Sequence, residues 1–549
     1  MKSKSIKNAI LLMASATMVL SVAACSKSNG DAGASTAPSA AASTASIAPS
    51  TPPSPATLKF LFMQSKPAEM DKVLADFEKR TKDTLNTKLD IEFAGSELTQ
   101  KLGLKMAVGE EVDLSFDYLG TGTLYQNIAR GYYQPLEKYF NNDAYPGLKK
   151  AFPPELIEAN KVNGHLYSIP MTEAWKIPGV IYYRKDLREK YGLQPIKTME
   201  EFQVLMDKVK EQNPELVPLA VRNTRGFANN EMFANEEVQK NIRTNPYFIS
   251  GTGVNFSVVL SDDGKKVLGA VTLGDPASDY ANLPAPYNKS DYLYQYLDKY
   301  VQWNKYLEED VLAQKNPGAL FNSGKAAASE WNVRAMADVK KTIQQAIPGA
   351  DIEYFVYNTK VANLQPQALG TNYIPYNHAV VPVTAKNVNR TMKVLDWIFS
   401  SQENNDLFTW GIEGEHWTKF GDNGYSRTDD QAKKYSFPWY ELSMNSMYER
   451  TNADTDPYAK KVLKFVKTNN AYFTLPLAQF VFDATPVKTE IAKVTAKLGE
   501  YMPLFVTGSD PNWRDTATVM NKELRALGLG KIRAELVKQV QAYLDKAGK

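Results

Sequence analysis

The stretch Leu58-Lys59-Phe60-Leu61-Phe62-Met63 decides the fold, because an apolar run of this length predicts a buried strand. Ser65 and Pro67 follow it and open a helix. The apolar residues of that helix share one face, and they are Met70, Val73, Leu74 and Phe77. A buried strand that leads directly into an amphipathic helix is typical of an α/β fold.

The same alternation continues along the chain. Residues 89–93 alternate between apolar and polar and predict a second strand. Residues 98–106 predict a helix that leads to Gly109, and residues 112–116 predict a third strand. Strands and helices in this order predict an α/β lobe with a largely parallel sheet.

The ends of these strands are the first candidate binding positions. Ligands of such sheets bind beyond the carboxyl ends of the strands. Gln64 follows the first strand, and Asp117 and Tyr118 follow the third. These three residues are therefore candidate substrate-binding residues.

Further elements follow from local patterns. Thr198-Met199-Glu200-Glu201 is a capping box, and the apolar spacing after it predicts a helix. An aromatic stripe at helical spacing over residues 292–307 is expected to lie in a core. Residues 379–383 predict a strand, residues 392–399 a buried helix, and residues 532–544 an amphipathic C-terminal helix.

Composition narrows the functional classes. The chain has 549 residues, 43% of them hydrophobic, so it can bury large cores. Lys and Arg total 64 against 61 Asp and Glu, which leaves no basic field for nucleic acid. One cysteine excludes a disulfide framework and a Cys-based zinc site, and three histidines leave little for a metal centre. We therefore expect no metal and no cofactor.

The first 24 residues have the pattern of a secretory signal peptide. Basic residues precede an apolar run, Ala9–Leu20, which is too short for a bilayer span of about 20 residues. An uncleaved membrane anchor is the alternative. Val22-Ala23-Ala24-Cys25 resembles the lipobox of bacterial lipoproteins, in which the cysteine is acylated and becomes the mature N-terminus. Cys25 is therefore the candidate lipidation site rather than a free structural thiol.

Residues 25–57 form the predicted lipidated cysteine and linker. The linker consists almost wholly of Ser, Ala, Thr, Pro and Gly, which cannot form a core. A long stalk of this kind suits the outer face of the cytoplasmic membrane of a Gram-positive cell. We expect a lipid-anchored globular protein there.

Catalytic signatures are absent from the sequence. It contains no His-Glu-x-x-His and no Gly-x-Ser-x-Gly. Gly120-Thr121-Gly122 and Gly528-Leu529-Gly530 lack the third glycine of a dinucleotide fingerprint. Glycoside hydrolysis needs two carboxyl groups at a defined distance in three dimensions, so the sequence does not exclude a catalytic pair of this kind. The sequence nevertheless favours a protein that is not an enzyme.

Several motifs, in order, resemble one family. These are Asn163-Gly164-His165-Leu166-Tyr167-Ser168-Ile169-Pro170, Val180-Ile181-Tyr182-Tyr183-Arg184-Lys185-Asp186-Leu187 with the capping box, Phe321-Asn322-Ser323-Gly324-Lys325-Ala326-Ala327, and Trp410-Gly411-Ile412-Glu413-Gly414-Glu415-His416-Trp417. Together they are similar to the extracellular solute-binding proteins of family 1. These are the sugar- and oligosaccharide-binding subunits of ABC importers, and they include maltose-binding protein.

This resemblance implies a two-lobed, periplasmic-binding-protein-like (type II) α/β fold with a hinge, an interlobe cleft and extra C-terminal helices. The N-terminal lobe would comprise residues 58–174 and 378–430, and the C-terminal lobe residues 175–377 and 431–549. The partners implied are an oligosaccharide and ABC transporter permease subunits, with the binding protein acting as a monomer.

The resemblance also supplies site residues. In relatives a tryptophan after the third motif lies in the sugar cleft, which makes Trp331 the first candidate. Trp175 and Glu173 lie at the expected first hinge crossing, and Trp410 and Trp417 lie in the fourth motif. Packing in a core is the alternative for each tryptophan, and it is the expectation for Trp303 and Trp397.

Charged candidates are fewer. Arg334 could bind the carboxylate of a uronic acid with its planar fork, or it could be a solvated or structural partner. His165, His378 and His416 are expected to be structural. Some large relatives carry a calcium loop after the capping-box helix, but residues 210–216 have too few oxygen ligands for calcium.

Three functional hypotheses remain. The first is a lipid-anchored oligosaccharide receptor of an ABC importer. The second is a surface enzyme that degrades polysaccharides, and the third is a sensor of the same fold. The fold also accommodates peptides and other solutes. The stretch from Gln479 resembles a helical tail found in only a subset of relatives, so the resemblance does not identify the ligand.

Overall fold

The first sheet forms around the apolar strand β1, Ala56–Phe62. Its strand order is β2-β1-β3-β13-β4. Strands β2 and β3 run parallel to β1, whereas β13 runs antiparallel to both β3 and β4. The predicted α/β order is confirmed, and the sheet is largely parallel as expected, because β2, β1, β3 and β4 run in one direction and only β13 is reversed. The other strands are β2 Thr87–Phe93, β3 Leu114–Tyr118, β4 Ile169–Met171 and β13 Asn377–Val380.

Helices cover this sheet and complete the first core. The two predicted helices between the strands are present, and α2 ends at Gly109 with a φ of 70°, a conformation that glycine adopts without steric cost. The helical segments of this part are α1 Met70–Thr81, η1 Gly95–Glu97, α2 Leu98–Val108, α3 Thr123–Ala129, η2 Glu137–Tyr139, α4 Pro146–Ala151, α5 Pro154–Ala159, α14 Val388–Ile398, α15 Gln402–Thr409, α16 Asp429–Lys434 and η6 Trp439–Glu441. A small sheet contains β14 Thr418–Phe420, β15 Gly424–Ser426 and β16 Thr451–Asn452.

A second sheet, of order β11-β5-β10-β6, has a core on each face. Along β5, Gly179–Arg184, Val180 and Tyr182 pack in one core, while Ile181 and Tyr183 pack in the other. Successive side chains of a strand point to opposite faces, so this alternation buries both sides of the sheet. Its other strands are β6 Val217–Ala220, β10 Ala326–Asn332 and β11 Ile352–Phe355.

Helices and small sheets surround this second part. The helical segments are α6 Lys185–Lys190, α7 Met199–Gln212, α9 Ala277–Tyr280, η3 Tyr292–Tyr294, α10 Tyr296–Asn304, η4 Val311–Ala313, α11 Pro317–Asn322, η5 Val333–Ala335, α12 Met336–Ala346, α13 Thr359–Ala362, α17 Pro457–Val466, η7 Asn469–Ala471 and η8 Thr485–Val487. The small sheets consist of β7 Tyr247–Ile249, β8 Phe256–Leu260 and β9 Val267–Val271, and of β12 Leu369–Thr371 with β17 Tyr472–Thr474.

Local predictions hold in this part. The Thr198 side chain accepts a hydrogen bond from the backbone N–H of Glu201, and the Glu201 carboxylate accepts one from the backbone N–H of Thr198. The predicted capping box therefore starts α7. In the aromatic stripe, Tyr300 and Trp303 are buried in the second core, and Trp303 stacks on Phe202 at 5.8 Å between ring centroids.

Three C-terminal helices belong to the second part: α18 Lys488–Val506, α19 Trp513–Ala526 and α20 Leu529–Lys546. Asp275, which follows β9, ties two of them to the small antiparallel sheet. Its side chain is fully buried and forms ion pairs with Arg525 and Arg533, at 2.5 and 2.6 Å. The C-terminal helices thus pack in the same core as β5 and β8 of the second part and do not form a separate domain.

The chain passes from one part to the other at defined places. It leaves the first core after Met171 and returns at Ala379. The sequence-based division puts residues from 431 on in the second part, but Tyr435 and Tyr448 pack in the first core, while Ala459 packs in one of the two cores of the second part. The last crossing therefore lies after Tyr448, because the apolar side chains of residues 435–448 help to fill the first core.

The structure, a computed structural model, describes residues 53–119, 123–172, 174–222, 226–227, 232–233, 247–249, 252–475, 477–478 and 480–546. These residues fall in the unit Pro52–Lys549. The predicted signal peptide, Cys25 and most of the predicted linker lie outside them. No helix among these residues has the length and apolarity needed to cross a membrane.

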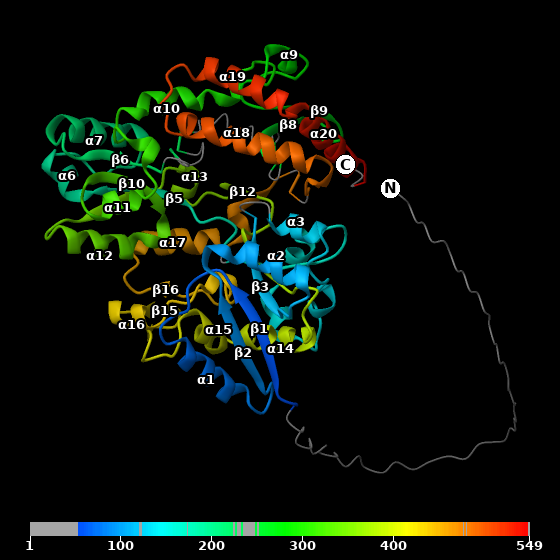
Figure 1. Ribbon diagram of the computed structural model, residues 1–549. Helices are drawn as coiled ribbons and strands as arrows, with labels where there is room; N and C mark the ends of the chain where they lie inside the picture. Colours follow the sequence, from blue (N-terminus) through cyan, green and yellow to red (C-terminus); the bar gives the residue numbers. More distant parts are fainter. Residues whose placement is uncertain are drawn as a thin grey trace, which may run out of the picture. The chain divides into compact units, whose positions relative to one another are not determined.

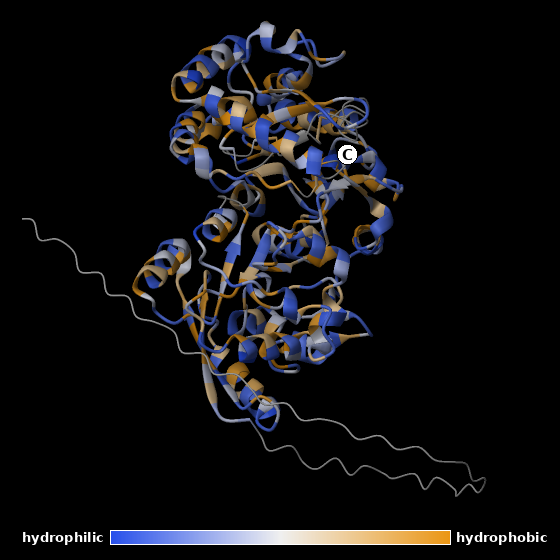
Figure 2. Cartoon of the chain, turned by 90° about the vertical axis from the view of Figure 1, so that its right-hand side faces the viewer, coloured by the Kyte–Doolittle hydropathy of each residue, from blue (hydrophilic) through white to orange (hydrophobic). Residues whose placement is uncertain are grey.

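The figures show how the two parts are built. In Figure 1 the first sheet with α1, α14 and α15 occupies the lower half of the folded unit, and α6, α7 and α10 occupy the upper half. Figure 2 shows that hydrophobic and hydrophilic residues alternate around the helices, as expected for amphipathic helices that cover sheets.

Candidate ligand-binding site

One edge of the first sheet gathers several chain ends. Strands β1 and β3 are parallel, so their carboxyl ends lie at the same edge. Because β13 is antiparallel to its neighbours, its first residue, Asn377, pairs with Tyr118 at the end of β3 and with Met171 at the end of β4. The chain also leaves for the second part from this edge.

A cavity of about 500 Å³ lies at this edge. Its volume is in the range of small-molecule binding sites. The lining residues come from the end of β1, from β3, from the start of β13 and from the segment around η6, and they are Met63, Phe116, Tyr118, Tyr376, Asn377, Trp439, Tyr440 and Met444. The cavity joins residues that are more than 300 positions apart in the sequence.

Aromatic rings dominate the cavity. Tyr118 stacks on Phe116 at 5.7 Å between centroids and on Tyr376 at 5.6 Å. Trp439 meets Tyr440 edge to face at 6.2 Å, and Tyr376 is 55% exposed. Ring faces next to hydroxyl groups and one amide suit a ligand that has an apolar face and polar edges.

Glu441 fixes one wall of this cavity. Its Oε2 accepts a hydrogen bond of 2.6 Å from the backbone N–H of Met63, and its Oε1 accepts one of 3.2 Å from that of Gln64. The side chain is buried, and burial raises the pKa of Glu441 to about 7, against the opposing effect of the two N–H groups. The short helix η6 is thereby held to the end of β1.

The predicted residues at the strand ends have different environments. Tyr118 lines the cavity. Gln64 is exposed, and its side chain hydrogen-bonds Tyr440. Asp117 is buried, and its carboxylate accepts hydrogen bonds from donors within the first part: the backbone N–H of Tyr118, the hydroxyl of Thr123, the amide of Asn127 and the hydroxyl of Tyr133. Asp117 therefore organises the end of β3 and does not line the cavity.

Arg334 connects the second part to the cavity wall. It comes from η5, directly after β10, and its guanidinium lies 5.8 Å from the ring centroid of Trp439. Its Nη2 also forms an ion pair of 3.0 Å with Glu449, whose other oxygen lies 2.9 Å from Nζ of Lys467. Arg334 therefore has a structural partner, Glu449, which was one of the two roles considered for it.

Trp331 and Trp175 lie near the crossings and outside the lining of the cavity. Trp331 is in β10, three positions before Arg334, and is 45% exposed. Trp175 packs partly against the first core and partly against a core of the second part. It meets Tyr373 of another crossing edge to face at 5.1 Å, which makes it a contact between crossing segments.

The remaining predicted residues are not in the cavity. Trp417 is buried, donates a hydrogen bond to the carbonyl oxygen of Gly411 and lies under the guanidinium of Arg450. Trp410 stacks on Tyr425 at 3.9 Å between centroids. Packing, which was the alternative for both tryptophans, is the role of the buried Trp417, whereas a ligand contact by the partly exposed Trp410 stays a prediction. Glu173 and Cys25 lie outside the described residues.

The wall formed by Trp439, Tyr440 and Met444 was not predicted from the sequence. Its local signal is the aromatic run Tyr435-Ser436-Phe437-Pro438-Trp439-Tyr440. Such a run does not distinguish core from site, and here Tyr435 and Phe437 lie in the core while Trp439 and Tyr440 line the cavity. Tyr376 and Asn377 also escaped notice, because only the apolar residues after them predict a strand.

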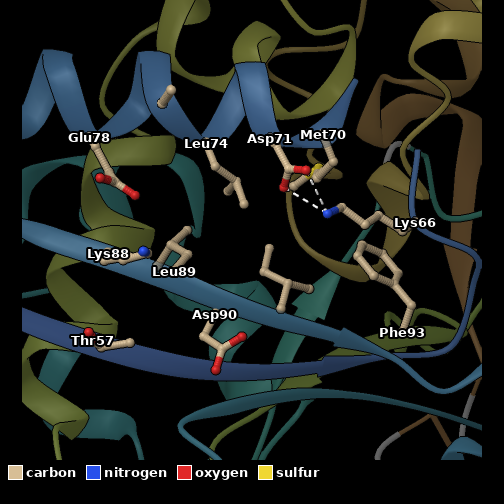
Figure 3. A pocket seen from close by; sticks show the side chains of 12 residues that line it. Thr57, Lys66, Met70, Asp71, Leu74, Glu78, Lys88, Leu89, Asp90 and Phe93 are labelled. Carbon is tan, nitrogen blue, oxygen red and sulfur yellow. Dashed lines mark hydrogen bonds and ion pairs between the residues drawn. The ribbon is translucent and has the colours of Figure 1, made fainter. Parts of the chain in front are cut away.

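A second cavity, of about 510 Å³, lies between α1 and the edge strand β2 (Figure 3). Leu74, Leu89 and Phe93 lie in it, and Glu78 and Asp90 are among its charged residues. An ion pair of 2.7 Å between Lys66 and Asp71 closes one end. The cavity is as large as the aromatic one but lies along a sheet edge away from the crossings, and Phe93 is its one described aromatic residue.

One cluster has residue types that bind metals. Glu69, Glu415 and His416 place ligand atoms within 4.8 Å of one another. Nζ of Lys72 already lies 2.9 Å from Glu69 and 3.5 Å from Glu415. Nδ1 of His416 accepts from the backbone N–H of Ile412, so its Nε2–H donates to Glu69. The arrangement is a hydrogen-bonded ion-pair cluster.

Comparison with known proteins gives two family matches. The model of bacterial extracellular solute-binding proteins matches residues 63–405, and that of a domain of unknown function (DUF3502) matches residues 476–545. A carbohydrate ABC transporter substrate-binding protein of Streptococcus pneumoniae serotype 4 (strain ATCC BAA-334 / TIGR4) is 22% identical over 89% of this chain and 91% of its own length.

Solved structures share the fold. The N-glycan transport solute binding protein (NgtS) from Streptococcus pneumoniae matches 90% of this chain and 99% of its own, with 19% identity and a TM-score of 0.67, and its complex with Man5GlcNAc has a TM-score of 0.59. Alginate-binding protein AlgQ2 matches 89% of this chain and 98% of its own, with 17% identity and a TM-score of 0.56. The fold is the two-lobed type II fold of periplasmic binding proteins, and the chain belongs to the family of bacterial extracellular solute-binding proteins.

Proposed function

We propose that this protein captures an oligosaccharide in the aromatic cavity and delivers it to an ABC importer. The observation that carries the proposal is the wall of Tyr118, Tyr376 and Trp439 beside the amide of Asn377. Pyranose rings have apolar C–H faces and hydroxyl edges, which match aromatic planes and amide groups. The named carbohydrate relative and the glycan complex of a protein of the same fold support it.

Closure of the two parts around the ligand would be the signal for the importer. A ligand that touches both parts binds the closed form more tightly and shifts the population towards it. Arg334 already connects η5 of the second part to Trp439 of the cavity wall. The protein would act as a monomer, with the permease subunits of the importer as its partners.

We also propose that acylated Cys25 anchors the protein to the outer face of the cell membrane, with residues 26–57 as a stalk. Acyl chains contribute about 0.8 kcal/mol per buried CH₂, so two or more chains hold a protein stably at a membrane. Radiolabelled palmitate fed to expressing cells is expected to enter the wild-type chain and not Cys25→Ser. Equal labelling of the two chains would contradict this anchor.

The ligand is tested with residues 53–549, which contain every core described above. Intrinsic tryptophan fluorescence and the melting temperature are followed against plant and bacterial oligosaccharides, and reducing ends are assayed in the same wells. A saturable shift without new reducing ends is the expected result, because a ligand that binds the native state raises its stability. New reducing ends would instead favour the surface enzyme, and no response to any saccharide would favour a peptide or another solute.

A further inference from the structure

The charge of the aromatic cavity bears on which saccharides it takes. The described residues that line it are uncharged without exception: three tyrosines, a phenylalanine, a tryptophan, an asparagine and two methionines. A carboxylate bound among these rings would lose water without gaining an opposite charge, which is costly. Removing a hydroxyl group from water costs much less free energy, and the hydroxyl group can hydrogen-bond Asn377 or a tyrosine.

The carboxylates next to the cavity are already engaged by donors of the protein. Asp117 accepts hydrogen bonds from Thr123, Asn127 and Tyr133. Glu441 accepts from the backbone N–H groups of Met63 and Gln64. Neither is placed to receive the hydroxyl groups of a ligand, so stacking and the neutral polar groups must do the recognition.

The cation at the rim is engaged as well. Arg334 lies against Trp439, but its Nη2 is 3.0 Å from Oε1 of Glu449. The Glu449 side chain keeps only 12% of its surface exposed, and Lys467 shares it. A ligand carboxylate that paired with Arg334 would have to compete with this carboxylate, and the displaced Glu449 would lose one of its two partners.

From these contacts we propose that the site takes an uncharged saccharide and discriminates against uronate-containing chains, because Glu449 occupies Arg334 at the rim of a neutral aromatic cavity. This inference rests on the proposed function. It goes further in naming the charge class of the ligand and Glu449 as the residue that enforces it. Glu449 acts through Arg334 and is therefore a specificity-determining residue that does not itself touch the ligand.

The test uses oligosaccharide pairs that differ only by a carboxylate at C5. β-1,4-Linked mannose and mannuronate oligomers form one pair, and galactose and galacturonate oligomers form another. Affinities for residues 53–549 are measured by tryptophan fluorescence at one ionic strength, because salt screens the charged member of each pair. We expect the neutral member of any bound pair to bind at least tenfold more tightly. Equal or tighter binding of the uronate would overturn this inference and leave the oligosaccharide function intact, whereas no binding of either member would overturn both.

A variant isolates the role of Glu449. In Glu449→Gln the cations Arg334 and Lys467 keep their charge and lose the negative charge of Glu449, so the preference for the neutral member is expected to fall at least fivefold. Addition of Arg334→Gln to this variant is expected to restore most of the preference. Glu403→Gln, at an exposed position of α15, is the matched control and should leave the ratio unchanged. An unchanged ratio in folded Glu449→Gln, verified by its melting curve, would remove Glu449 from the proposal.

Discussion

Glu441 and Met63 are 378 positions apart in the sequence, yet Oε2 of Glu441 accepts a hydrogen bond of 2.6 Å from the backbone N–H of Met63. This bond joins the end of the first strand to the short helix that carries Trp439 and Tyr440. The two sides of the aromatic cavity therefore depend on a single buried carboxyl group.

The Glu441 carboxyl group is expected to make stability depend on pH. Burial raises its pKa from 4.5 to about 7, so on increasing pH the unfolded chain loses this proton first. The stabilisation is complete below pH 4.5 and is lost as pH rises through 7, by about 3 kcal/mol in total. Melting curves between pH 4 and pH 8 test this.

Glu441→Gln removes the titrating group and keeps one carbonyl oxygen as acceptor. The melting temperature of this variant relative to wild type is expected to rise between pH 5 and pH 8. Glu403→Gln is the control, since that side chain is exposed and its melting curves should follow wild type at every pH. Parallel curves for Glu441→Gln and wild type would mean that Glu441 is already ionised at pH 5.

Trp439→Ala is expected to weaken saccharide binding more than it weakens the fold. Loss of a stacking plane corresponds to about 2 kcal/mol of binding, or about thirtyfold in affinity. Titration with the saccharide identified in the binding panel measures the loss. Phe420→Ala removes another exposed aromatic ring, outside the cavity, and should bind as wild type does. Unchanged affinity for Trp439→Ala would place the ligand elsewhere.

Asp117→Asn is expected to affect stability and to spare binding. The substitution leaves some of the four donors around this buried carboxylate without an acceptor, which costs about 2 kcal/mol. Tyr133→Phe removes one donor and should cost less. Affinity measured well below the melting temperature should stay within about threefold of wild type, a difference of roughly RT. A large loss of affinity at unchanged stability would make Asp117 a ligand contact.

Asp275→Ala is expected to loosen the C-terminal helices. The substitution removes a fully buried carboxylate but leaves Arg525 and Arg533 their pairs with Asp279, so the cost is expected to stay below the about 3 to 5 kcal/mol of a buried charge without any partner. Urea unfolding followed by tryptophan fluorescence reports it, because Trp513 lies at the start of α19. Glu490→Gln breaks a pair with the largely exposed Lys531 and should change the unfolding curve little. Similar curves for the two variants would show that the Asp275 cluster is dispensable.

Local sequence determined the elements that depend on local interactions. The apolar run from Leu58 and the alternation of residues 89–93 both became strands of the first sheet. The capping box at Thr198 started a helix at the next residue, since a cap acts within one turn. These patterns can be recognised from neighbouring residues alone, although the strands still need distant partners for their backbone hydrogen bonds, as β1 needs β2 and β3.

Residues that combine a local pattern with a distant partner were harder to assign. Asp117 lies at a strand end, where ligands bind, yet its carboxylate serves Tyr133 and Asn127 of its own part. Trp417 belongs to the fourth of the motifs on which the family resemblance was based and is nevertheless buried. Position in a motif does not state where a side chain points, because that depends on packing around it.

The sequence by itself determined the α/β class, the family resemblance and the order of the elements around the first sheet. Only the tertiary structure decided the cavity: Tyr118 from β3, Tyr376 before β13 and Trp439 from η6 meet at one edge of the sheet. Periodicity describes neighbours along the chain, whereas this wall depends on the antiparallel register of β13 and on the hydrogen bonds that Glu441 accepts across 377 positions or more.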